Sequence, residues 1–305
     1  MKNKLKNIIP YAGLILVFLL FVVLTSGRIL NAKNIKMIVE QSILVIISSI
    51  GVVFVMSLGS LDFSQGSMLG IGSIVAAKLS YVSIPLAVAA TILVCTAIGA
   101  LNGFLHVRLR IPSFIVTMCM MFVFRGLTSY LTRESALQVS FKIYDLDNFT
   151  LKLIVTVALV FVGFYIFHFT YFGRQAKAIG AGEIAARYSA VSVDKMKILV
   201  FALAGLTGGI CAFMNIVRVG TATANTGSLH ETDVLVALVL GGMSVTGGAR
   251  SRYSSVVVGG VMLAVLANGL VMLGVGIAQQ QLIKGVIFMA AVALTAGKSK
   301  GVTVK

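Results

Sequence analysis

Ten apolar runs, separated by short polar or glycine-bearing stretches, dominate the pattern of hydrophobic and polar positions along the chain. They lie approximately at residues 11–27, 37–58, 66–81, 84–107, 112–131, 151–172, 196–218, 233–248, 254–274 and 281–297. A helix needs about 20 predominantly apolar residues to span the hydrocarbon core of a bilayer. The pattern therefore predicts an all-α membrane protein with about ten transmembrane helices, which form a single domain over residues 1–305.

The third and eighth runs are short and rich in glycine, so we expect one or both to be broken or re-entrant. Irregular backbone is tolerated at membrane depth only where protein or water surrounds it. We therefore expect a translocation path beside the stretches 59–73 and 241–248. The polar residues expected along this path are Asp62, Ser64, Ser67, Ser73 and Ser244. Asp62 should face water or a polar partner, and the alternative is a helix-capping role.

A weak internal similarity, called the sequence echo below, suggests a repeat. Small residues recur at the same offsets in the stretches 59–73 and 241–248: Gly59, Ser64 and Gly66 match Gly241, Thr246 and Gly248. An Asn-Gly pair also occurs twice, at Asn102-Gly103 and Asn268-Gly269. Structural repeats are common in transporters. Chance matching in glycine-rich sequence is the alternative.

Composition excludes a soluble globule, because 58% of the residues are hydrophobic, 11% are charged and the mean hydropathy is +1.03. The net charge of +16 comes from Lys and Arg that lie mostly between the apolar runs, where they report topology. Ten crossings put both termini on one side, and the basic loops indicate that this side is the cytoplasm. The first run is then interpreted as a signal anchor.

The longest inside loop, at 173–197, has a helix-compatible centre from Glu183 to Tyr188. An ordinary solvated connector is one interpretation. The other is a docking element, since its small residues would let a short helix approach a partner's groove closely. The residues expected at this contact are Ala178, Gly180, Glu183, Ala185, Ala186 and Ser189.

Several ordered motifs along the chain carry a resemblance. They are LDFSQGS at 61–67, IPSFIVT at 111–117 followed by Arg125-Gly126, GRQAKAIGAGEIAARYSAV at 173–191 and GGMSVTGG at 241–248. Together they resemble the permease family of the ribose, xylose and galactose ABC importers, from about residue 40 to 296. The sequence departs from the family's usual pattern at three positions: Gly182 stands where Asn is common, Ala190 replaces a usual Gly, and Arg250 falls where another Gly is expected.

The resemblance implies the transmembrane permease of an ATP-driven importer in the bacterial cell membrane. It would form the path for a monosaccharide or similar small polar solute. The implied partners are a second permease, identical or related, two ABC ATPase subunits that dock on the 173–197 loop, and an extracytoplasmic binding protein. The chain lacks a phosphate-binding loop ending in Gly-Lys-Ser or Gly-Lys-Thr, so ATP and Mg²⁺ would bind the partner ATPases. The chain itself is then expected to be no enzyme and to bind no cofactor. It is also expected to bind no nucleic acid, since topology explains its positive charge.

Two other classes are weighed against this interpretation. An ion-coupled secondary transporter would need carboxylates such as Glu40, Asp62 or Glu231 near the bilayer midplane. An intramembrane enzyme would need paired carboxylates, a metal motif or a nucleophile with its base, and the scattered histidines and isolated cysteines show no such spacing. Arg125 and Lys284, within apolar runs, are expected to snorkel or to make structural hydrogen bonds.

Overall fold

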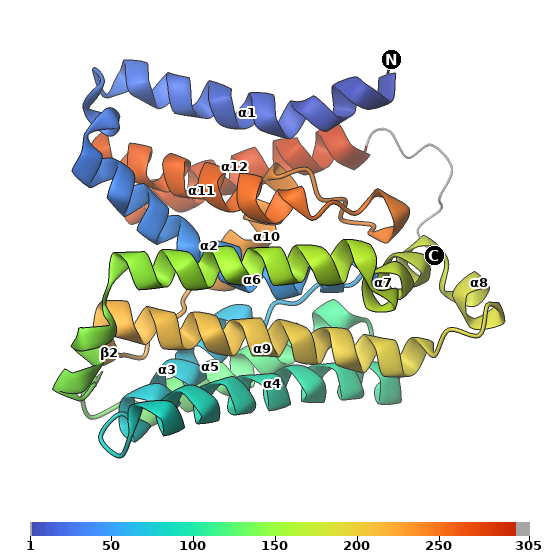
Figure 1. Cartoon of the computed structure of the whole chain (residues 1–305), viewed down its shortest axis with the longest axis horizontal. Coiled ribbons are helices and arrows are strands. Elements are labelled where there is room, and N and C mark those ends of the chain that lie inside the picture. Colours follow the sequence, from blue (N-terminus) through green and yellow to red (C-terminus); the bar gives the residue numbers. More distant parts are fainter. Residues whose placement is uncertain (1, 297–305) are drawn as a thin grey trace.

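The computed structural model describes residues 2–296, and most of them belong to helices packed side by side (Figure 1). The helices are α1 (Lys2–Leu24), α2 (Ala32–Ser57), α3 (Gln65–Leu79), α4 (Ile84–Leu109), α5 (Ser113–Leu131), α6 (Phe149–Phe169), α7 (Tyr171–Ala181), α8 (Glu183–Tyr188), α9 (Val193–Val219), α10 (His230–Leu240), α11 (Ser254–Met272) and α12 (Ile277–Ala296). Short elements connect them: the 3-10 turns η1 (Arg28–Leu30), η2 (Phe141–Leu146) and η3 (Gly248–Arg250), and the antiparallel pair β1 (Leu137–Gln138) and β2 (Thr221–Ala222).

The apolar runs predicted from the sequence coincide with helices, and six of these helices, α2, α4, α5, α6, α9 and α11, are long and apolar enough to cross a membrane. The apolar parts of α1 and α12 are shorter. The third and eighth runs form α3, with 15 residues, and α10, with 11 residues. At 1.5 Å per residue these helices are about 22 and 16 Å long, less than the roughly 30 Å of a hydrocarbon core. Both helices are thus too short to cross the core alone, as expected if one or both runs are broken or re-entrant.

The packing reveals an inverted repeat that relates α2–α5 to α9–α12. In each set a long helix is followed by a short one and then by two further helices. Equivalent helices make equivalent contacts with the other half. α4 packs on α9, and its counterpart α11 packs on α2. The short helix α3 packs on α9 and α5, and its counterpart α10 packs on α2 and α12. Corresponding helices run in opposite directions (Figure 1). Inverted repeats of this kind place broken helices at the interface between the halves.

The repeat agrees with one of the two sequence matches: Asn102-Gly103 and Asn268-Gly269 lie in the corresponding helices α4 and α11. The glycine match has a different register. Loop 58–64 follows α2 and therefore corresponds to the loop after α9, at 220–229, whereas 241–248 follows the short helix α10. The echo between Gly59 and Gly241 thus does not mark equivalent positions and is wrong. The two stretches nevertheless touch, because a Cβ added at Gly59 would lie 3.2 Å from the carbonyl oxygen of Thr246.

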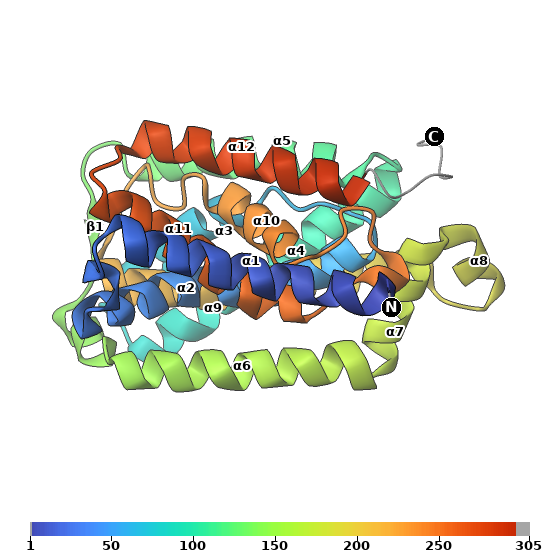
Figure 2. The same ribbon diagram turned by 90° about the horizontal axis from the view of Figure 1, so that it is seen from above.

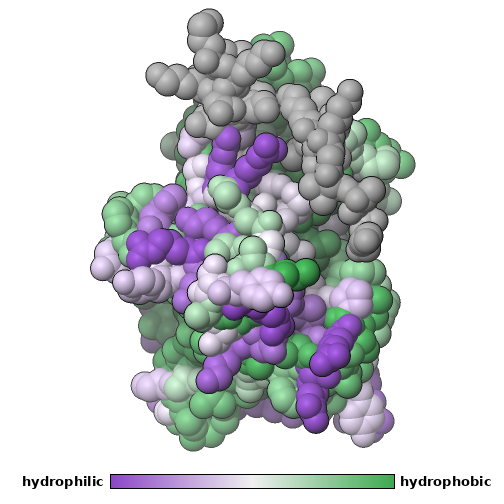
Figure 3. Space-filling model, turned by 90° about the vertical axis from the view of Figure 1, so that its right-hand side faces the viewer, coloured by the Kyte–Doolittle hydropathy of each residue, from purple (hydrophilic) through white to green (hydrophobic). Residues whose placement is uncertain are grey.

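The molecule has two distinct ends and two distinct long faces. The start of α1, the end of α12 and helices α7 and α8 lie at one end, called the α8 end below, and the β1–β2 pair lies at the other (Figure 2). Hydrophilic residues gather at the α8 end, as Figure 3 shows. α6 forms one long edge of the molecule, and α5 and α12 lie along the opposite one (Figure 2).

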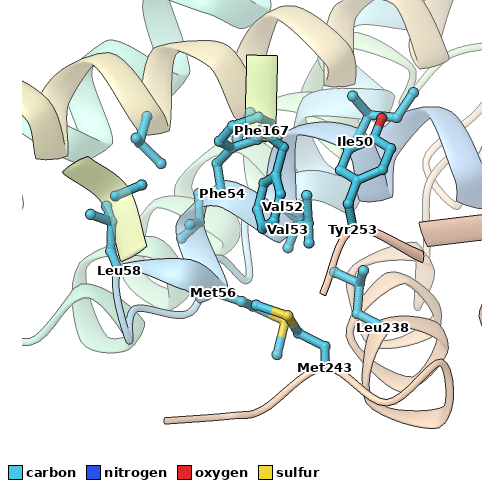
Figure 4. Packing of buried hydrophobic residues seen from close by; sticks show 14 of the residues in the cluster. Ile50, Val52, Val53, Phe54, Met56, Leu58, Phe167, Leu238, Met243 and Tyr253 are labelled. Atoms are coloured by element: carbon cyan, nitrogen blue, oxygen red, sulfur yellow. The ribbon is translucent and has the colours of Figure 1, made fainter. Parts of the chain in front are cut away.

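The largest buried cluster lies near the α8 end and ties α2 to α6, α10 and the segment before α11. Phe167 of α6 packs edge-on against Phe54 of α2, with ring centroids 5.2 Å apart, and lies 5.5 Å from the ring of Tyr253. Figure 4 shows these rings beside Met56, Met243 and Leu238. The Tyr253 hydroxyl donates to the Val160 carbonyl at 3.0 Å, so its polar atom is satisfied. Ala176 and Ile179 of α7 and Ala186 of α8 belong to the same cluster, which therefore holds both helices on the rest of the chain.

Candidate functional site

The two short helices begin where the halves of the repeat meet. α3 and α10 start midway along the molecule and run toward opposite ends (Figures 1 and 2). A Cβ added at Gly66, in the first turn of α3, would overlap the Gly227 carbonyl and the Glu231 carboxylate. Glycine is therefore required at Gly66 to let the chain before α10 approach this closely. This meeting point is the centre of the candidate site.

Asp62 organises the entry into α3. Its carboxylate is fully buried and accepts hydrogen bonds from the Ser64 backbone N–H at 2.9 Å, the Ser64 hydroxyl at 2.5 Å and the Gln65 amide at 2.8 Å. Asn102 of α4 donates in turn to the Ser64 hydroxyl at 2.8 Å. Asp62 thus has polar partners and also caps the turn before α3. The two roles considered for it, contact with a polar partner and helix capping, are both seen.

Two of the motifs found in the sequence contact each other. The backbone N–H of Leu61 donates to the Ser113 hydroxyl and that of Phe63 donates to the Thr117 hydroxyl, both at 3.1 Å. The motif at 61–67 is therefore held by the first turn of α5, at 111–117. Backbone N–H groups that lack a helix partner at membrane depth need such acceptors.

The polar residues expected along the path do not line an open surface. Four of them, Asp62, Ser64, Ser67 and Ser73, are almost completely buried in the subunit, with 2% or less of their surface exposed. Ser67 donates to the Ser64 carbonyl at 2.8 Å, as an internal helix serine does. Ser244 is half-buried in the loop at the α8 end. The first four side chains are thus enclosed within the subunit, and the expectation that all five residues border the path stays a prediction.

Two ion pairs that the sequence interpretation missed flank the start of α10. The Arg125 guanidinium of α5 donates to both carboxylate oxygens of Glu231, at 2.9 and 3.0 Å. The Lys284 ammonium of α12 lies 2.8 Å from the Asp233 carboxylate. Glu231 and Asp233 occupy the first turn of α10, where the helix dipole favours negative charge. Arg125 and Lys284 are thus anchored by partners and do not snorkel.

The 173–197 loop folds as α7 and α8, and two residues expected at the partner contact pack against the chain itself: Ala186 is buried and Gly180 is half-buried. A Cβ at Gly180 would overlap the Ser57 carbonyl and come within 2.7 Å of the Gly248 backbone nitrogen. Ala186 is 4% exposed and belongs to the main buried cluster. Both positions therefore contribute to the chain's own packing, and their expected place at a partner contact stays a prediction.

The outer surface of α8 combines expected residues with two large apolar ones that the sequence analysis did not name. Ile184 is 73% and Tyr188 is 89% exposed, so the rest of the described chain leaves both side chains largely uncovered. Of the residues expected at the contact, Ala178, Ala185 and Ser189 are exposed and Glu183 is half-exposed. Large exposed apolar side chains on a short polar-flanked helix are typical of a docking surface.

Ion pairs fix α8 to the start of α9. Glu183 accepts from the Lys197 ammonium at 2.8 Å and from the Arg187 guanidinium at 3.2 Å. Arg187 also pairs with Asp194 at 2.5 Å. Partial burial would raise the pKa of Glu183, but the hydrogen bonds from Lys197 and Arg187 outweigh it and hold that pKa below its usual value. Glu183 is therefore charged at neutral pH and positions α8 from within the chain.

The three departures from the family pattern have different structural consequences. Ala190 has φ 60°, the left-handed region that favours glycine, so a side chain there is strained. Gly182 has φ 175°, an extended conformation that any residue adopts. Arg250 lies in η3 with an exposed side chain, and no positive φ calls for glycine there. The close backbone approach near this point is made by Gly247 and Gly248 instead.

Comparison with known proteins identifies the class of molecule. The model of the family described as branched-chain amino acid transport system / permease component matches residues 34–292. This chain belongs to that permease family. It is similar to the ribose import permease protein RbsC of Escherichia coli (strain K12), with 31% identity over 91% of this chain and 90% of the relative.

Other similar permeases have different named solutes. The L-arabinose ABC transporter permease protein AraH of Azospirillum brasilense is 32% identical over 94% of this permease and 87% of its own length. The xylose transport system permease protein XylH of Escherichia coli (strain K12) is 28% identical over 95% of this chain and 91% of its own. No solved structure matches the chain.

The charged residues inside or beside the apolar runs could have revealed the ion pairs that the sequence analysis missed. Arg125 and Lys284 are basic residues inside apolar runs, and Glu231 and Asp233 are acidic residues at the start of another. A charge inside a membrane-spanning permease needs a partner of opposite sign. Matching two basic with two acidic residues would have predicted the pairs, though not which residue pairs with which.

Proposed function

We propose that this chain is the transmembrane permease subunit of an ATP-driven importer for a monosaccharide or a similar small polar solute. The observation that carries this proposal is the end-to-end similarity to three permeases whose names specify ribose, L-arabinose and xylose. The similarity covers both the broken-helix core and the α7–α8 loop, so it includes the parts a permease needs to pass a solute and to receive a motor.

The energy would come from partner subunits. The chain lacks a phosphate-binding loop, so ATP and Mg²⁺ would bind separate ABC ATPases and the permease itself would not be an enzyme. Two permease copies, identical or related, would enclose the path, and an extracytoplasmic binding protein would deliver the solute. The exposed surface of α8 formed by Ile184, Ala185 and Tyr188 is the contact offered to the ATPase.

The proposed location is the bacterial cell membrane. The basic residues of the α7–α8 loop and of the loops at 106–111 and 250–252 favour a cytoplasmic α8 end. Because α1 begins and α12 ends at that same end, both flanking termini of the described helices would be cytoplasmic (Figure 2). The β1–β2 end would then meet the binding protein.

The proposal is tested by purifying the permease from its native membrane in a mild detergent and identifying the proteins that accompany it. An ABC ATPase and a periplasmic or lipid-anchored sugar-binding protein are the expected partners. Recovery of the permease with its transport activity intact but without any ATPase would overturn the proposal. A permease in which Phe141, 90% exposed at the β1–β2 end, is replaced by Ala should retain the ATPase and serves as the control.

A further inference from the structure

Four charged side chains form a band between the ends of the molecule, on the face opposite α6. Arg125 comes from α5, Glu231 and Asp233 from α10, and Lys284 from α12. In Figure 1 α10 lies between α12 and α5, and Figure 2 places α5 and α12 along the same edge. The band therefore crosses one face of the subunit, with α10 as its middle element.

Lipid is a poor neighbour for this face. A charged side chain near the centre of a membrane helix is costly to expose to hydrocarbon, and four of them lie close together. The α6 edge carries no such band, because its charged residue Lys152 is buried near the β1–β2 end against Asp147. Both edges expose large apolar side chains, such as Phe161 on α6 and Phe122 on α5, so the charged band is what distinguishes the α5–α10–α12 face.

Polar side chains are exposed next to the two ion pairs. Asn225, Ser228 and Thr232 are exposed on α10 and the loop before it. The Ser228 hydroxyl accepts from Arg125 at 2.7 Å, so it is part of the charged band, and Thr232 lies between Glu231 and Asp233 in sequence. Arg125 and Asp233 each keep 25% of the side chain exposed, whereas Glu231 and Lys284 keep 7% and 9%. One charged group of each pair is thus within reach of a molecule on this face.

We propose that this face, with Ser228 and Thr232 between the pairs Arg125–Glu231 and Lys284–Asp233, is a solute-contacting wall of the translocation path and that it takes uncharged, hydroxyl-rich molecules. The inference rests on the proposed function. Two positive and two negative groups give the band no net charge. A hydroxyl can donate to the exposed carboxylate of Asp233 and accept from Arg125 while both pairs stay intact.

An ionic solute would be treated differently. A cation could bind strongly only by displacing Arg125 or Lys284 from its carboxylate, and an anion only by displacing Glu231 or Asp233. Breaking a pair of this kind leaves an uncompensated charge at membrane depth, which is strongly unfavourable. The pair with Arg125 also occupies Glu231, one of the carboxylates considered for coupling to protons or sodium, so this contact disfavours ion-driven transport through Glu231.

The test uses the assembled transporter with Cys119, which is exposed, replaced by Ala. Thr232 is then replaced by Cys and treated with membrane-impermeant methanethiosulfonates, one cationic (trimethylammonium) and one anionic (sulfonate). Both reagents should block uptake and react at rates within about threefold of each other, because a neutral band concentrates neither charge. Val162→Cys on the α6 edge, 56% exposed in the chain, is the matched control and should not react because lipid covers it.

A second variant tests the charge balance. Adding Lys284→Gln to Thr232→Cys uncovers the Asp233 carboxylate, so the cationic reagent should become about tenfold faster, or more, relative to the anionic one. An unchanged ratio would overturn the assignment of neutrality. If Thr232→Cys stays unreactive in resting and ATP-bound complexes while uptake is normal, the proposal that this face is a wall of the path is overturned, and the proposed function stands. The proposal is also overturned if mild oxidation joins the introduced thiols of two copies in a disulfide and the reagents gain no access. That result would show a permease–permease contact instead.

Discussion

Glycine at Gly180 is the residue through which the α7–α8 loop touches the broken-helix core. Its Cα lies so close to the end of α2 and to Gly248 that an added methyl group would overlap the Ser57 carbonyl. α8 is tied to α9 and α7 to the 241–248 loop. We therefore expect a displacement of α8 by a partner to be transmitted through these backbone contacts to the end of α2 and to the loop that follows α10.

Replacing Gly180 with Ala should separate α7 from these loops, because the obstructing atoms are backbone and cannot rotate away. We expect a destabilisation of about 1–3 kcal/mol, typical of overpacking, and loss of ATP-dependent uptake. Melting temperature in detergent and uptake in vesicles are the measurements. Gly182→Ala is the control, since its nearest neighbour would be 3.8 Å away, and it should behave like the wild type. Equal effects of both changes would contradict the account.

Replacing Ala190 with Gly should stabilise the chain, the opposite of the Gly180 change. A non-glycine residue in the left-handed region costs roughly 1–2 kcal/mol. The greater flexibility of glycine in the unfolded chain offsets about 0.5–1 kcal/mol of the strain that is relieved. Ala190→Gly should therefore slow amide hydrogen exchange of α8 by up to about fivefold, which corresponds to about 1 kcal/mol. Ala185→Gly, inside α8, should speed exchange by a similar factor. Faster exchange in Ala190→Gly would show that the side chain makes a compensating contact.

The short helix α8 is the element on which coupling to a partner depends. The sequence predicted its position from basic ends and small residues, and the helix forms from Glu183 to Tyr188 as expected. It could not predict which side faces outward, because six residues make fewer than two turns and the ion pairs to Lys197 and Asp194 set the rotation. Hence Ala186, expected outside, is buried, while Ile184 and Tyr188 are exposed.

Removing the exposed side chains tests α8 without disturbing its packing. The double change Ile184→Ala and Tyr188→Ala should lower ATPase recovery in mild detergent about tenfold or more, because most of the apolar contact area is lost. Membrane insertion and melting temperature should stay unchanged. Full ATPase recovery would show that the contact lies elsewhere, with the exposed Tyr171 at the start of α7 as the next residue to examine.

The whole molecule combines predictable helices with an arrangement that sequence patterns do not encode. Apolar runs of about 20 residues and the two short ones predicted the helices, since lipid demands continuous hydrophobicity. The sequence suggested a repeat, and the matching Asn-Gly pairs lie in the corresponding helices α4 and α11. Its inverted arrangement could not be predicted because it relates packing positions and not residue types, and the glycine match had the wrong register. The ion pairs of α10 escaped because they join residues 106 and 51 positions apart in the sequence.

Orientation is a property of the whole molecule that the basic loops predict. With Cys119 replaced by Ala, Tyr188→Cys at the α8 end and Phe141→Cys at the opposite end are both at highly exposed positions. An impermeant thiol reagent added to intact cells, after opening of any outer membrane, should label residue 141 and spare residue 188. After lysis both should react. Labelling of residue 188 in intact cells would place the α8 end outside and exclude ATPase docking there.

The central claim is that this permease moves a sugar at the expense of ATP, and uptake into proteoliposomes tests it most directly. The complex purified in mild detergent would be reconstituted with ATP sealed inside, and accumulation of labelled ribose, L-arabinose and xylose measured with the accompanying binding protein outside. We expect accumulation of at least one of these sugars to require internal ATP and to persist when ionophores collapse every ion gradient. Accumulation driven by a proton or sodium gradient without ATP would contradict the account.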